Sequence, residues 1–179
     1  MPREEQTKFK PSIRLACELD VPELAEIRGS QRSDTTGEDR RAIHDELDFL
    51  DRLALPHGDD YFCIVAEDDG RVVGYLIGGG SRDLDRKAHG EIYELAVLPA
   101  FRRRGVARTL LDDALDRFDA AAFAGTLISA PANDEAVRRL ATGLEMQPDG
   151  HRDETRSIIR YERALRATAR TRSTTRDAT

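Results

Sequence analysis

The chain of 179 residues has no tryptophan, only two cysteines and no long apolar run. None of its apolar runs approaches the roughly 18 residues that a membrane-spanning helix needs. The charged N-terminal stretch MPREEQTKFKPS also lacks the apolar centre of a secretory signal. The sequence therefore predicts a cytoplasmic protein with no membrane partner, and its length fits a single core.

Residues that bind transition metals are scarce and scattered. The four histidines (44, 57, 89 and 151) do not fall at the spacing of a zinc site. Cys17 and Cys63 each lie in an apolar, strand-like run, which favours buried free thiols over metal ligands. We therefore predict no metal site.

Lysine is also scarce, since it supplies three of the 28 basic residues, and aspartate (20) outnumbers glutamate (14). A GC-rich genome and a high-salt cytoplasm both produce this bias, and the sequence favours neither. The last 14 residues carry four arginines and one aspartate, a net charge of +3. Because the whole chain has a net charge of −6, residues 1–165 carry −9. An acidic body repels a phosphate backbone, which argues against a nucleic-acid partner.

Composition divides the chain into three regions. Residues 1–11 are expected to be a flexible N-terminal segment, and residues 12–165 form the folded domain. Residues 166–179 contain no large apolar side chain and are expected to be a disordered basic tail.

The first half of the domain predicts a strand, two helices and a hairpin. Ile13–Cys17 is strand-like, and Asp20 is placed to cap a helix from about Val21 to Gly29. Leu19 and Leu24 take the positions of a hydrophobic staple. A second helix before Pro56 carries an apolar face of Ile43, Leu47, Leu50 and Ala54. The stretch DYFCIVAEDDGRVVGYLIGGG then predicts two strands joined at Asp69-Gly70.

The second half alternates strands and helices. GEIYELAVL and Gly125–Ala130 are strand-like, and a last strand is expected near Ile158–Tyr161, with another short one near Met146. Asn133 is placed to cap a helix that points Ala136, Val137 and Leu140 inward. The clearest helix has an apolar stripe of Ala107, Leu110, Leu111, Ala114, Leu115 and Phe118. These patterns predict a mixed α/β domain with helices on both faces of one sheet.

Three consecutive arginines, Arg102, Arg103 and Arg104, lie between a predicted strand and the first turn of that helix. Helix N-termini present unpaired N–H groups and a partial positive charge, which favour an anion. Gly105 lets the backbone approach a ligand, and guanidinium groups suit phosphate. A solvated basic turn is the plainer alternative, but the strand before and the helix after favour an anion site.

The stretch ELAVLPAFRRRGVARTLL resembles the acyl-CoA-binding core of the GNAT superfamily of N-acetyltransferases. Arg102, Gly105 and Ala107 match its Arg/Gln-x-x-Gly-x-Gly/Ala motif, and NDEAVRRLATGLEM is similar to the family's Asn-x-x-Ala helix, beginning at Asn133. The resemblance spans Ile13 to about Leu165. It implies a mixed sheet splayed between its fourth and fifth strands, with acetyl-CoA as cosubstrate, and it allows a homodimer.

The same resemblance implies the cofactor-binding residues. The pyrophosphate would lie on the backbone amides from Arg102 to Ala107, Val106 included, and Asn133 would contribute from its helix. The pantetheine arm would pair with the backbone of Leu95, Ala96 and Val97, where a backbone N–H would also bind the developing oxyanion.

The resemblance further implies transfer of an acetyl group to a primary amine of a small molecule or peptide. Glu91 would take the amine proton, with Glu94 as the alternative. Strand alternation puts these two on opposite faces unless a bulge intervenes.

The tyrosine that many relatives use as general acid is replaced by Leu140, although Tyr93 and Tyr161 are possible substitutes. A catalytically silent acyl-CoA-binding module is therefore the alternative. The acceptor entrance would carry Glu38, Asp39, Asp83 and Asp85, whose charge suits a cationic amine.

Overall fold

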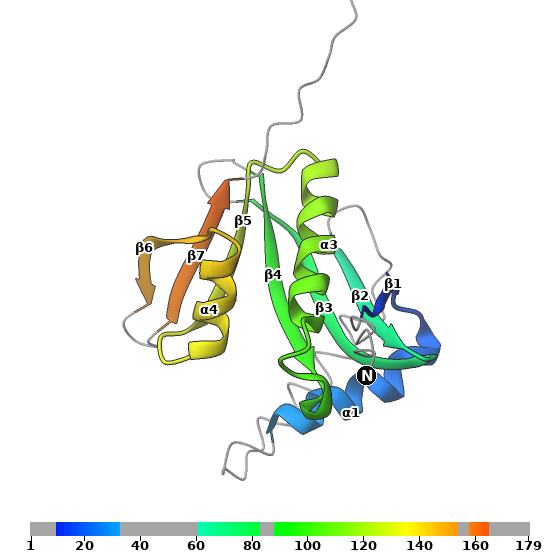
Figure 1. The fold of residues 1–179 in the computed structure, drawn as a ribbon. Helices are drawn as coiled ribbons and strands as arrows, with labels where there is room; N and C mark the ends of the chain where they lie inside the picture. The colour runs from blue at the N-terminus through cyan, green and yellow to red at the C-terminus, as the bar shows by residue number, and fades with distance from the viewer. Residues whose placement is uncertain (1–9, 33–60, 83–87, 154–157, 165–179) are drawn as a thin grey trace, which may run out of the picture.

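Within the residues described by the computed structural model (10–32, 61–82, 88–153 and 158–164), the strands form one open sheet in the order β1-β2-β3-β4-β5-β7-β6 (Figure 1). The helix expected before Pro56 lies outside these residues. The elements are β1 (Ser12–Leu15), η1 (Glu18–Asp20), α1 (Val21–Arg32), β2 (Tyr61–Asp68), β3 (Arg71–Arg82), β4 (Ala88–Val97), η2 (Pro99–Phe101), α3 (Val106–Ala120), β5 (Gly125–Pro131), α4 (Glu135–Gly143), β6 (Gln147–Asp153) and β7 (Ile158–Ala164).

Helices cover both faces of the sheet, as the sequence predicts. One buried cluster joins α3 and the end of α4 to the sheet through side chains such as Leu110, Phe118 and Ala141. A second cluster, on the opposite face, joins Leu24 and Ile27 of α1 to β2, β3 and β4. We call these the α3 face and the α1 face.

Local sequence patterns predict two of the features that organise this sheet. The β2–β3 hairpin turns at Asp69 and Gly70, whose φ angles of 49° and 80° fit the left-handed conformation that an Asp-Gly turn favours. The apolar stripe of α3 is also confirmed. Its buried residues are Val106, Leu110, Leu111, Ala114, Leu115 and Phe118, so Val106 is buried in addition to the prediction and the predicted Ala107 is only partly buried.

The sheet divides between β4 and β5, as expected. The two strands pair in parallel only from Gly90 to Ile92 on β4, and beyond that point they diverge (Figure 1). The β3–β4 register also shifts there, since Gly78 pairs with Ile92 while Ile77 pairs with Glu94. Tyr93 is the extra residue, so a β-bulge lies where β4 leaves β5.

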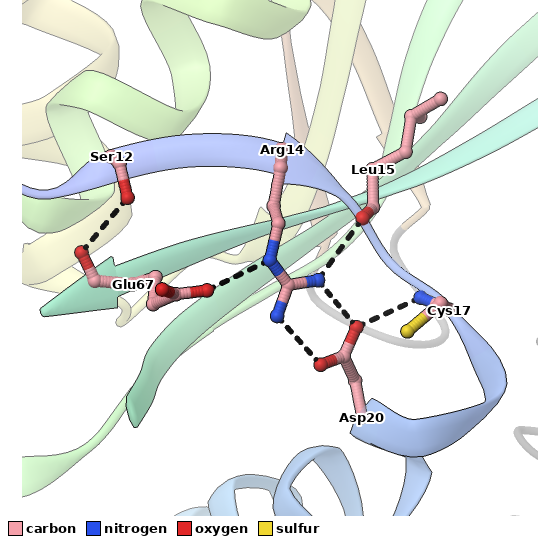
Figure 2. Close-up of polar contacts among 6 residues, drawn as sticks. All are labelled: Ser12, Arg14, Leu15, Cys17, Asp20 and Glu67. Atoms are coloured by element: carbon pink, nitrogen blue, oxygen red, sulfur yellow. Dashed lines mark hydrogen bonds and ion pairs between the residues drawn. The ribbon is translucent and has the colours of Figure 1, made fainter. Parts of the chain in front are cut away.

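The start of α1 differs from the prediction. Asp20 does not cap α1 but ends η1, where its carboxylate accepts hydrogen bonds from the Cys17 N–H (2.8 Å) and from two nitrogens of Arg14 (2.7 and 2.8 Å) (Figure 2). Arg14 also donates to Glu67 of β2 at 2.8 Å. Leu19 is 87% exposed, so it forms no staple. The extra turn of η1 rotates Leu19 outward and turns Asp20 toward the sheet.

Two other local expectations are wrong. Cys63 is buried, which raises the pKa of its thiol to about 12, but Cys17 follows the end of β1 and is exposed. The cap of α4 is Asp134, whose carboxylate accepts the N–H groups of Ala136 and Val137 at 3.0 Å. With the helix starting one residue later, Ala136 is exposed rather than buried.

Candidate active site

A cleft of about 510 Å³ lies on the α3 face, where the sheet divides. The second half of β4 and the first turns of α3 and α4 form its walls. Its lining residues are Gln31, Leu95, Val97, Phe101, Arg102, Arg103, Gly105, Val106, Ala107, Arg108, Asp134, Ala136, Val137, Arg139 and Leu140. The cleft therefore connects the separated part of β4 to two helix N-termini.

The N-terminus of α3 is arranged to receive an anion. The first hydrogen bond of the helix joins the Thr109 N–H to the Gly105 carbonyl at 2.9 Å, so the amides before Thr109 precede the intrahelical ladder. Gly105, at the N-cap, has φ 91° and supplies no capping side chain. A β-carbon built on Gly105 would have no atom within 4 Å, so the space before these amides is wide. The helix dipole adds partial positive charge there.

The three arginines next to this helix have different surroundings. Arg102 donates from Nε to the Val97 carbonyl at 3.2 Å and from a terminal nitrogen to Gln31 at 3.0 Å. Gln31 donates to the same carbonyl at 3.0 Å, so α1, β4 and the arginine turn are tied together. Arg103 lines the cleft with φ 64°, and Arg104 lies over the ring of Phe101 at 5.3 Å.

The bulge brings Glu91 and Glu94 to the same face of the sheet. A β-carbon on Gly90 would contact Phe118, and Ile92 packs in the same cluster, so these two residues point to the α3 face and Glu91 points to the α1 face. Glu94 also lies on the α1 face, because its carboxylate accepts a hydrogen bond at 2.5 Å from Tyr75, a residue of that core. Of the two arrangements left open by the sequence, the structure has the bulged one.

The two carboxylates differ in their partners. Besides Tyr75, Glu94 has an ion pair with Arg28 of α1 at 3.2 Å, and both side chains are largely buried. Burial and the Glu94 carboxylate raise the pKa of Tyr75 well above its usual range. Glu91 is half-buried, and its side chain forms no hydrogen bond or ion pair with any residue that the structure describes.

Most of the predicted binding residues line the cleft. Ala96, Arg104 and Asn133 do not: the side chain of Ala96 belongs to the α1-face core, and Asn133 precedes the capping residue Asp134. Sequence reasoning missed Gln31, which lies three residues after Arg28 and so on the same side of α1. The acidic entrance residues Glu38, Asp39, Asp83 and Asp85 lie outside the described residues.

No tyrosine lines the cleft. Leu140 occupies the position expected for the acid and faces the cleft. Tyr161 is buried in the α3-face core, and Tyr93 belongs to the opposite face, where it stacks on Tyr61. In the described segments, we find no group of three metal-ligating side chains, and no helix there has the length and hydropathy of a membrane span.

The comparisons with known proteins agree with this geometry. A family model described as the acetyltransferase (GNAT) family matches residues 23–143. The fold is similar to that of the ribosomal-protein-S18-alanine N-acetyltransferase from Escherichia coli (TM-score 0.64, 17% identity, 90% of this chain and 98% of that chain). It is also similar to that of an N-acetyltransferase from Staphylococcus aureus Mu50 (TM-score 0.71, 19% identity, 88% of this chain and 100% of that chain).

A third similar structure is the phosphinothricin acetyltransferase from Sinorhizobium meliloti, which was crystallised with acetyl-CoA (TM-score 0.68, 18% identity, 88% of this chain and 89% of that chain). The family match covers well over half of the sequence, and the divided sheet and cleft agree with it. The chain therefore belongs to the GNAT acetyltransferase family, whose cosubstrate is acetyl-CoA.

Proposed function

We propose that the protein is an N-acetyltransferase that transfers an acetyl group from acetyl-CoA to a primary amine of a small molecule or peptide. The observation that carries the proposal is the cleft, which joins the α3 N-terminus to the part of β4 that has left β5. An anion site suits the pyrophosphate of an acyl-CoA, and the part of β4 that no longer pairs with β5 suits its pantetheine arm.

In this proposal the backbone amides from Arg102 to Ala107 bind the pyrophosphate. Arg103 adds positive charge at the cleft, and Gly105 leaves room for the approach. Arg102 has a second role, because its bonds to Val97 and Gln31 fix the end of β4 against the helix. The backbone of Leu95, Ala96 and Val97 pairs with the pantetheine arm.

Glu91 is the base that we propose. The acceptor nitrogen forms a bond to the acetyl carbon, the carbon–sulfur bond breaks, and one ammonium proton must leave before attack. Glu91 points to the face opposite the cleft, but it lies next to the point where β4 and β5 separate and the two faces are open to each other. Its side chain has no competing partner among the described residues. A backbone N–H of Leu95–Val97 stabilises the oxyanion.

The departing thiolate takes a proton from water in this scheme, and the hydroxide so formed takes the second proton that the acetylated nitrogen must lose. Among the described residues that line the cleft, Leu140 included, none offers a hydroxyl acid, but a thiol with a pKa of about 8.5 is a fair leaving group. The same observation supports the second candidate, a module that binds acyl-CoA without turning it over.

Turnover separates the two candidates. We expect free thiol to appear when the protein is mixed with acetyl-CoA and a panel of polyamines, aminoglycosides, amino acids and peptide N-termini, with acetylated product seen by mass spectrometry. Tight binding of acetyl-CoA by calorimetry, without product from any amine, would favour the silent module. No binding at all would contradict both.

A further inference from the structure

A row of three residues crosses the sheet on the α1 face beside the proposed base. Tyr61 of β2 pairs with Gly79 of β3, and Gly79 pairs with Glu91 of β4. Paired residues of neighbouring strands share a face, and strands lie about 4.8 Å apart. Because the middle residue is a glycine, no side chain separates Tyr61 from Glu91 along this row.

The bulge fills part of that space with a second ring. Tyr93, the extra residue of β4, stacks on Tyr61 with ring centroids 5.9 Å apart and planes 23° from parallel. The two rings therefore meet across β3. Tyr93 is 39% exposed, among the most exposed large apolar side chains in the described chain, so part of the residue lies at the surface, where a ligand can contact it.

The charges around this pair favour a cation. Glu94 and Arg28 neutralise each other, and Glu91 has no ionic partner among the described residues. The described part of this face thus combines an aromatic ring with the Glu91 carboxylate. The same row continues across β5 to Glu162, whose carboxylate lies 3.5 Å from the His89 ring. A cation is attracted to both the aromatic ring and Glu91, because an aromatic face carries negative electrostatic potential.

We propose that Tyr93, supported by Tyr61, selects acceptors that carry a second ammonium group in addition to the amine that reacts. The inference rests on the proposed function and specifies its substrate class. The reacting nitrogen lies at Glu91 and the second ammonium lies on the Tyr93 ring. Residues two apart in a strand are about 6–7 Å apart, a span that fits a short alkyl diamine.

Butane-1,4-diamine and butylamine are a matched pair of probes, since only the first has a second charge. We expect the diamine to bind the complex of protein and CoA at least tenfold more tightly by calorimetry. Tyr93→Leu should weaken diamine binding about 3- to 30-fold and leave butylamine binding unchanged. Tyr93→Phe should restore diamine binding, because it keeps the ring. Asp116→Asn, on the exposed side of α3, is the control.

Three results would overturn the inference: equal affinity for both probes, equal weakening of both by Tyr93→Leu, or preference for 2-phenylethylamine over the diamine. The last would indicate stacking of an aromatic acceptor instead. Failure of the proposed function would be seen in a different experiment. A silent module would yield no acetylated amine, but the affinities of the diamine and of butylamine could still be compared by calorimetry.

Discussion

At the residue scale, Glu91 and Glu94 show how surroundings separate two similar side chains. Both lie on the α1 face of β4, but Glu94 is held by Tyr75 and Arg28. Protonating Glu94 would disrupt that buried pair, whereas Glu91 has no such partner among the described residues. We therefore propose Glu91 as the base and a structural role for Glu94.

Replacing Glu91 by glutamine keeps its size but removes the basic site. We expect kcat to fall by about two to four orders of magnitude near neutral pH, the usual range for loss of a general base. Higher pH should partly restore activity, because more amine arrives deprotonated, and CoA affinity should not change. In the parallel variant Glu94→Gln we expect a lower melting temperature and a smaller loss of kcat. Normal turnover of Glu91→Gln at every pH would show that another group takes the proton.

Asp20 is a second residue whose role depends on its partners. The Arg14 guanidinium, with help from the Cys17 N–H, lowers the pKa of this buried carboxyl below its usual value (Figure 2). A carboxylate with a lowered pKa in the folded state stabilises the fold above its unfolded pKa of about 3.9. That contribution is lost as pH falls through the folded pKa.

We therefore expect Asp20→Asn to lower the stability at pH 7 by about 1–3 kcal/mol, or about 3–10 °C in melting temperature for a domain of this size. The difference from the unmodified protein should shrink in melts below about pH 4. Asp116→Asn, the same change at an exposed position, should have little effect. A constant difference from pH 7 to pH 2 would contradict the ion-pair account.

At the scale of elements, the N-terminus of α3 and the end of β4 function together. The arginine turn brings the early amides of α3 to the cleft, and Arg102 and Gln31 attach the Val97 carbonyl to it. The proposed anion site and the separated part of β4 are therefore held in a fixed relation. Changes at the helix start should affect cofactor binding before they affect the fold.

Two substitutions test this site. Gly105→Val places a branched side chain before the helix amides in a left-handed conformation that valine disfavours, so we expect CoA binding to be lost. Arg102→Ala should weaken CoA binding about 10- to 100-fold, because it removes charge-assisted contacts and loosens β4. Arg71→Ala, which removes an exposed arginine at the β2–β3 hairpin, is the charge-matched control. Unchanged calorimetric affinity in both site variants would refute the assignment.

At the scale of the whole molecule, the acidic body and its surface pairs respond differently to salt. Residues 1–165 carry a net charge of −9. The exposed pair Arg108–Asp112 and the partly buried pair Arg117–Asp113 on α3 each stabilise the fold by about 0.3–0.5 kcal/mol. At molar ionic strength the Debye length falls to about 3 Å, which screens both effects.

If the aspartate and arginine bias reflects a saline cytoplasm, relief of self-repulsion should dominate. The melting temperature should then rise between low and molar KCl. Calorimetric melts in KCl measure the change, and parallel melts in an uncharged osmolyte separate screening from general solute effects. A flat or falling melting temperature would leave genome composition as the better explanation.

The sequence by itself determined the features that depend on neighbouring residues. The hairpin at Asp69-Gly70 requires positive φ, and the α3 stripe repeats at helical spacing. The arginine motif between a strand and a helix suggested a resemblance to the GNAT family, and the family match confirms that family. Each of these signals lies within about 20 residues of chain, so local geometry and periodicity suffice.

Only the tertiary structure decided features that depend on contacts between distant segments. The bulge at Tyr93 arises from the register of β4 against β3, and it brought Glu91 and Glu94 to one face. Glu94 received its partners from α1 and β3, and Tyr93 received its stacking partner from β2. A one-residue change in strand register reverses the direction of each following side chain. The faces of these residues, and so their roles, were therefore fixed by strand pairing across the sheet.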